Sequence, residues 1–155
     1  MKWLHLSDLH YNPKRDGTST YQLREKLLKY LAEEKITADH LFLTGDYRHA
    51  KYQKDDEEDA AREAAQYILR IAEAAKVYPA NIHVIPGNHD LSQTMDTNRI
   101  KRIKENYDAC NGRFQQEDAE FLLERFSFFR YLNRELGKPW KYTKKCRKKL
   151  ALNLR

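Results

Sequence analysis

Three short apolar runs, each followed at once by polar residues, constrain the fold of this 155-residue chain more than any other feature. The runs cover residues 2–6, 40–44 and 82–85, and each has the length and composition typical of a strand. Helical spacing of apolar residues fills the segments between them. The order strand, helix, strand, helix, strand predicts right-handed crossovers and a parallel sheet, so the expected fold class is α/β.

The helices are expected from periodicity and capping residues. Ser19 with Gln22 fits a capping box for a helix that runs to about Lys35. Alanines recurring from Ala61 to Ala75 predict a second helix, whose small residues allow close approach to a sheet. Two further helices are expected, at residues 97–109 and 117–136.

Several other residues are assigned by their surroundings in the sequence. Residues 40–44 are interpreted as a buried parallel strand. His5 and His83 lie within strand runs and are expected to be core histidines. Arg48 is expected to be a solvated loop residue, with a bidentate contact to a phosphate as the alternative. The mixed-charge segment 51–59 is expected to be a solvated loop.

The polar residues after the three runs are of types that bind metal ions: Asp8 and His10, then Asp46, then Asn88, His89 and Asp90. Because ligands gather at the carboxyl ends of parallel strands, these side chains are expected at one edge of the sheet. Carboxylate, imidazole and amide groups together suit Mn²⁺, Fe or Zn²⁺. The alternative is a set of turn and strand-cap residues, but turn formation does not call for histidine in both the first and the last group.

In chain order these groups read Asp-Leu-His at 8–10, Gly-Asp at 45–46 and Gly-Asn-His-Asp at 87–90. The series resembles the first three motifs of the calcineurin-like metallophosphoesterases, and the resemblance covers roughly residues 1–92. It implies a site for two metal ions. Asp8 and His10 would bind the first ion, Asp46 would bridge both, and Asn88 would bind the second.

The same resemblance implies hydrolysis of a phosphomonoester or phosphodiester substrate. A water held between two cations loses a proton and attacks phosphorus in line. His89 would lie beside the substrate phosphate as general acid or charge stabiliser. Asp90 would orient His89 by hydrogen bonding to its ring.

The family pattern is incomplete, because no histidine follows Asp90 in the sequence. The later family motifs, a lone His and a GHxH block, supply the other ligands and belong to the half that forms the second sheet of the sandwich. The chain thus resembles the N-terminal βαβαβ half of the metallophosphatase sandwich, followed by helices. We expect weak or single-ion occupancy, Mn²⁺ foremost, and little activity. A truncated product, a fragment and one part of a split protein all fit.

The net charge of +6 is unevenly distributed. Of the 29 Lys and Arg residues, eight lie in residues 138–155, where Asp and Glu are absent; the other 21 face 23 acidic residues, a net charge of −2. The predicted organisation is a truncated metallophosphoesterase domain, 1–137, and a basic tail, 138–155. The tail is either a frayed terminus or a nucleic-acid contact. The alternative function is a degenerate, non-catalytic scaffold that binds nucleic acid or a protein through this tail.

Compartment and assembly follow from composition. Cys110 and Cys146 form no disulfide framework, which predicts free thiols in a reducing compartment. Apolar runs fall short of the roughly 18 residues of a membrane span, so we expect a cytoplasmic protein with no membrane partner. Half of a sandwich exposes a sheet face or edge, which predicts a homodimer or cover by the missing C-terminal half.

Overall fold

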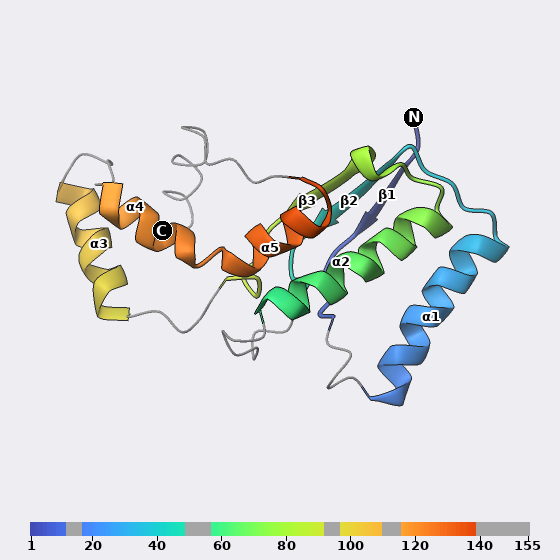
Figure 1. The fold of residues 1–155 in the computed structure, drawn as a ribbon, viewed down its shortest axis with the longest axis horizontal. Helices are drawn as coiled ribbons and strands as arrows, with labels where there is room; N and C mark the ends of the chain where they lie inside the picture. Colours follow the sequence, from blue (N-terminus) through green and yellow to red (C-terminus); the bar gives the residue numbers. More distant parts are fainter. Residues whose placement is uncertain (12–16, 49–56, 92–96, 110–115, 139–155) are drawn as a thin grey trace.

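The computed structural model of the chain describes residues 1–11, 17–48, 57–91, 97–109 and 116–138. The strands β1 (Trp3–Leu6), β2 (His40–Thr44) and β3 (Ile82–Ile85) form a parallel sheet in that order. Helix α1 (Thr18–Glu33) connects β1 to β2, and α2 (Glu57–Ala74) with the short 3₁₀ helix η2 (Pro79–Asn81) connects β2 to β3. The predicted α/β class with parallel strands is confirmed (Figure 1).

Three more helices follow the sheet: α3 (Thr97–Ala109), α4 (Gln116–Glu124) and α5 (Ser127–Glu135). Helix α5 returns to pack against α2, whereas α3 and α4 lie beyond the sheet, at the left of Figure 1. A small apolar cluster in this region contains Ile103, Leu122 and Phe126, and it is separate from the main core. None of the helices in the described ranges combines the length and apolar character needed to cross a bilayer.

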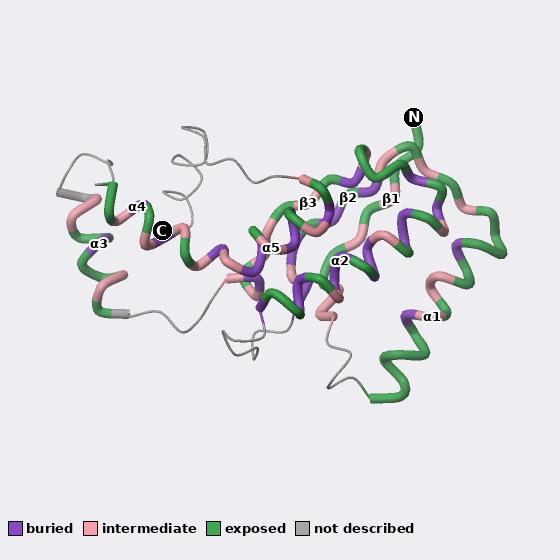
Figure 2. The backbone as a smooth tube through the Cα atoms, in the orientation of Figure 1, coloured by how far each residue is buried: buried purple, intermediate pink, exposed green. Residues whose placement is uncertain are grey.

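The main core lies on one face of the sheet, under α2 and α5. Leu41, Leu43 and Ile82 point into it from the strands, because alternate strand residues face the same side. The expected alanine face of α2 is buried there, including Ala61, Ala64, Ala65 and Ala72. Figure 2 shows the buried residues of α2, β2 and α5 gathered together.

The opposite face of the sheet is exposed in the described residues. Trp3 is 61% exposed, Ile85 51% and Phe42 37%. His5 and His83 point the same way, so the prediction that they are core histidines is wrong. They alternate with the leucines and valine that face α2, and that alternation places both rings outside. Strand β2 is therefore buried on one face only.

Two predicted helix boundaries also differ from the structure. Helix α1 begins at Thr18 after the N-cap Gly17, which makes no side-chain cap hydrogen bond, so the capping box at Ser19 is wrong. Helix α2 begins at Glu57, so residues 57–59 of the segment expected to be a solvated loop are helical, and residues 51–56 lie outside the described residues. Its buried glutamate explains that early start, because Glu57 has an ion-pair partner in the core.

The expected helix over residues 117–136 is two helices, α4 and α5. A tight turn separates them, in which the N–H groups of Arg125 and Phe126 bond to carbonyl groups three residues back. Phe126 packs in the small cluster, whereas Phe128 and Phe129 pack in the main core. The break allows neighbouring aromatic residues to serve both clusters. The tail from residue 139 onward lies outside the described residues, and its proposed role stays a prediction.

Candidate metal centre

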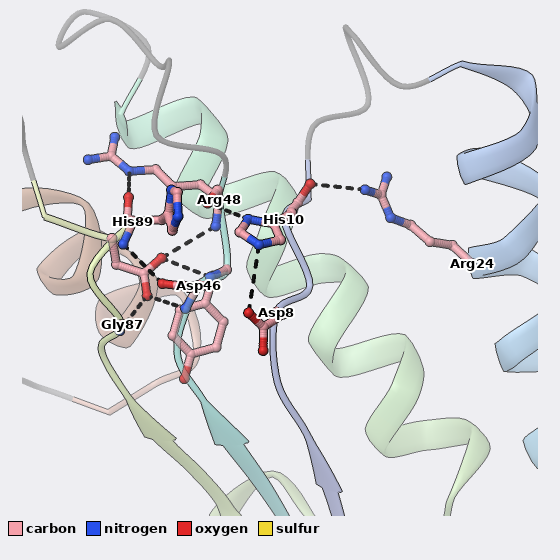
Figure 3. A network of polar contacts seen from close by, with 9 residues as sticks. Asp8, His10, Arg24, Asp46, Arg48, Gly87 and His89 are labelled. Carbon is pink, nitrogen blue, oxygen red and sulfur yellow. Dashed lines mark hydrogen bonds and ion pairs between the residues drawn. The ribbon is translucent and has the colours of Figure 1, made fainter.

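The ends of β1 and β2 bring three predicted ligand residues together. Asp8, His10 and Asp46 each offer a ligand atom, and these atoms lie within 4.8 Å of one another. His10 Nε2 is 3.8 Å from Asp8 Oδ1. The group is partly exposed to solvent. Figure 3 shows the labelled side chains around the ends of the strands. Two carboxylates and one imidazole are a donor set that suits a divalent ion such as Mn²⁺, Fe²⁺ or Zn²⁺.

All three of these residues have left-handed backbone conformations. The φ angles are +54° for Asp8, +40° for His10 and +55° for Asp46. Such angles are unfavourable for residues with a Cβ and gather at functional sites. Hydrogen bonds between the two loops hold them: Asp8 N–H donates to Gly45 O at 3.2 Å and His10 N–H to Asp46 O at 2.9 Å. The backbone conformation of these loops therefore determines where the three side chains point.

The two glycines of the motifs allow the second and third loops to touch. A Cβ on Gly45, whose φ is +92°, would lie 2.5 Å from Gly87 Cα. A Cβ on Gly87 would overlap Asp46 Oδ1. Both positions therefore require glycine for the loops to approach.

Asp90 lies fully buried beneath these loops and binds their backbones. Its Oδ1 accepts the N–H groups of Tyr47 at 2.8 Å and Arg48 at 3.3 Å. Its Oδ2 accepts those of Asp46 and Gly87, both at 2.8 Å. The expected hydrogen bond to the His89 ring is replaced by these four bonds, which fill the usual acceptor capacity of a carboxylate. Burial raises the pKa of Asp90, and the backbone hydrogen bonds oppose that rise.

His89 and Asn88 occupy the loop between Gly87 and Asp90. The backbone N–H of His89 donates to Asp46 Oδ1 at 2.9 Å, which links the second and third loops again. The His89 ring packs edge-on against the His10 ring, with centroids 5.0 Å apart. The side chain of His89 thus lies beside His10, next to the group formed with Asp8 and Asp46. Asn88 is exposed in the same loop.

A buried ion pair supports the site from behind and contradicts the expectation for Arg48. The Arg48 Nη2 is 2.9 Å from Glu57 Oε1, and both side chains are only 4% exposed. Arg48 Nε donates to His89 O, and its guanidinium lies over the Phe128 ring. Ser127 donates to the other oxygen of Glu57. Burial of Arg48 is possible because α2 provides Glu57 as its ion-pair partner and α5 provides the Phe128 ring that its guanidinium contacts.

Tyr47 is a second supporting residue that the sequence did not reveal. Its buried hydroxyl lies 2.7 Å from Leu43 O and accepts the Ile85 N–H at 3.1 Å, which joins the ends of β2 and β3. Burial, with the nearby Asp90 charge, raises its pKa. In the sequence, the only sign that Tyr47 and Arg48 support the site is that they directly follow Asp46.

Comparison with known proteins assigns the chain to a family. The family model described as calcineurin-like phosphoesterase matches residues 1–154, well beyond the 1–92 range of the visible motifs. The chain is also 31% identical, over 99 residues, to the uncharacterized metallophosphoesterase-like protein YydB of Bacillus subtilis. That alignment covers 61% of this chain and 18% of the relative's length. No solved structure matches the chain.

Proposed function

The chain belongs to the calcineurin-like phosphoesterase family, and we propose that its function is metal-dependent hydrolysis of a phosphomonoester or phosphodiester. The observation that carries this proposal is the group of Asp8, His10 and Asp46 at adjoining strand ends. A divalent ion bound there would act as a Lewis acid and would lower the pKa of the water bound to it. Mn²⁺ is the proposed ion, with Fe and Zn²⁺ as the alternatives that the same donor set accepts.

The residues around the group have distinct proposed roles. Asp8 and His10 would hold the ion from one loop, and Asp46 would hold it from the next. One oxygen of Asp46 is oriented by the His89 N–H, so its carboxylate is fixed before an ion binds. The His89 ring, beside His10, is proposed to stabilise charge on the phosphoryl oxygens or protonate the leaving group. Asn88 is the proposed further ligand, from an exposed position. Asp90 acts through the loop backbones.

The proposed domain, residues 1–137, lacks the later family histidines, so low activity is expected. The test is hydrolysis of bis-p-nitrophenyl phosphate by the whole chain with added Mn²⁺, alongside Mn²⁺ binding by calorimetry. Asp46→Asn is expected to weaken Mn²⁺ binding by about tenfold or more, since it removes a charged ligand. His89→Asn is expected to retain Mn²⁺ binding and lose hydrolysis.

The matched control is Asp59→Asn, because Asp59 is an exposed carboxylate in an ion pair with Arg62 on α2. It is expected to leave both measurements unchanged. Hydrolysis that survives both Asp46→Asn and His89→Asn at full rate contradicts the proposed site. Mn²⁺ binding that is the same in the Asp46 variant and the unaltered chain contradicts the ligand assignment.

A further inference from the structure

A cavity of about 620 Å³ adjoins the candidate metal centre. Asp8 and His10 contribute to its lining, and most of the other lining residues belong to α1. Tyr67 of α2 contributes to the lining as a ring that is 4% exposed. The metal ligands and this cavity therefore share a wall, and a molecule bound at one is within reach of the other.

The α1 side of the cavity is an apolar stripe of which only Leu27 packs against the protein core. Leu23, Leu27 and Tyr30 lie at helical spacing on one face of α1, and all three line the cavity. Leu23 is 68% exposed and Tyr30 is 56% exposed, although both are large and apolar. An apolar stripe left open beside a polar metal group is typical of a ligand site.

Arg24, next to Leu23 on α1, connects this helix to the loop that carries His10. Its guanidinium donates to the backbone carbonyl of His10 at 3.2 Å and lies 4.5 Å from the Tyr11 ring centroid. The Tyr11 ring in turn stacks on Tyr67 with a centroid distance of 5.2 Å. Arg24 is 9% exposed and Lys26 lies beside it at the cavity. The cavity thus combines flat rings, aliphatic side chains and positive charge, which complement an anion carrying an apolar group.

We infer that this cavity binds the organic group of the phosphoester, and that this group is aromatic. The inference rests on the proposed function, because the phosphate is placed at Asp8 and His10. It names a substrate class: phosphoesters of an aryl group or of a nucleoside, whose flat ring packs against the exposed side chains of Leu23 and Tyr30. Leu23 and Tyr30 then determine specificity without taking part in hydrolysis.

The test is calorimetric binding of three phosphomonoesters to the Mn²⁺-loaded chain: methyl phosphate, phenyl phosphate and thymidine 5′-phosphate. We expect at least one aromatic ester to bind about tenfold more tightly than methyl phosphate, as burial of a ring predicts. The two aromatic arms distinguish an aryl group from a nucleoside. The double variant Leu23→Ser/Tyr30→Ser is expected to lose this preference and retain methyl phosphate affinity. Both side chains are largely exposed, so the fold does not depend on them.

Tyr78→Ser is the matched control, since Tyr78 is 77% exposed and does not line the cavity. It is expected to retain the preference. Equal affinity for all three esters, or a preference that survives the double variant, overturns the inference. The Mn²⁺ dependence of methyl phosphate binding separately tests the metal centre. A preference that persists without Mn²⁺ dependence contradicts the proposed function and supports the cavity assignment.

Discussion

The carboxylate of Asp90 accepts the backbone N–H of Tyr47 at 2.8 Å, a residue 43 positions earlier in the chain. Three further backbone N–H groups bond to the same carboxylate. Asp90→Asn replaces one acceptor oxygen by a donor that faces two N–H groups. We expect the free energy of unfolding to fall by about 3 kcal/mol, measured by urea denaturation. Asp39→Asn is the control, because Asp39 also accepts a backbone N–H but is exposed. Equal effects of the two variants contradict the assigned role.

The Arg48–Glu57 ion pair is expected to be strongly coupled because both side chains are buried. Arg48→Met and Glu57→Gln each leave a buried partner uncompensated, and each is expected to destabilise the protein by about 3 kcal/mol. The double variant should lose clearly less than the sum, which thermal or urea unfolding of all four proteins measures. Arg62 and Asp59 form an exposed pair at the same 2.9 Å distance. A double-mutant cycle there should give a coupling below about 0.5 kcal/mol. Additive losses at Arg48 and Glu57 refute the prediction.

Gly87→Ala is expected to weaken Mn²⁺ binding while the sheet remains folded. The added methyl group overlaps Asp46 Oδ1, so the carboxylate must move from its position beside Asp8. We expect an affinity loss of about tenfold in calorimetry, with little change in the circular dichroism spectrum. Gly17→Ser adds a side chain in open space at the start of α1 and serves as control. Unaltered affinity in Gly87→Ala shows that the contact does not constrain Asp46.

Stability should decrease in alkali because of Tyr67. Burial raises the pKa of Tyr67 to about 12, above the ordinary value of 10.0. The unfolded chain therefore releases this proton at lower pH than the folded chain, and stability falls as pH rises from about 10 toward 12. Tyr67→Phe should reduce that slope, measured by urea unfolding at each pH. Tyr78→Phe, at an exposed position, should leave the slope unchanged. The same slope in both variants contradicts the shift.

Metal stoichiometry is the fifth prediction. The described residues gather three strong ligands at one position, Asp8, His10 and Asp46. For the second metal ion of the family site, the only predicted ligands in this sequence are Asp46 and the neutral amide of Asn88. We expect calorimetry and elemental analysis to give one Mn²⁺ per chain. Two tightly bound ions per chain contradict this expectation.

The sheet and the convergence of Asp8, His10 and Asp46 were predictable because both follow from local patterns. Apolar runs mark strands, and residues after parallel strands meet at one edge. Their roles as ligands stay a prediction. Partners that depend on distant packing were not predictable: Arg48 finds Glu57 and Phe128 only once α2 and α5 have docked. Asp90 was recognised as a residue of interest, but its partners depend on how closely Gly87 approaches Asp46.

The left-handed backbone of Asp8, His10 and Asp46 costs stability at the residues proposed to bind the ion. A sequence optimised for stability alone favours glycine at such angles, because the Cβ atom of any other residue comes close to the adjoining carbonyl oxygen. Carboxylates and an imidazole occupy those positions here, and the hydrogen bonds between loops compensate for the strain. The loops thus hold these three side chains within reach of one another. Engineering that relaxes these angles is expected to give a more durable protein and a poorer ligand group.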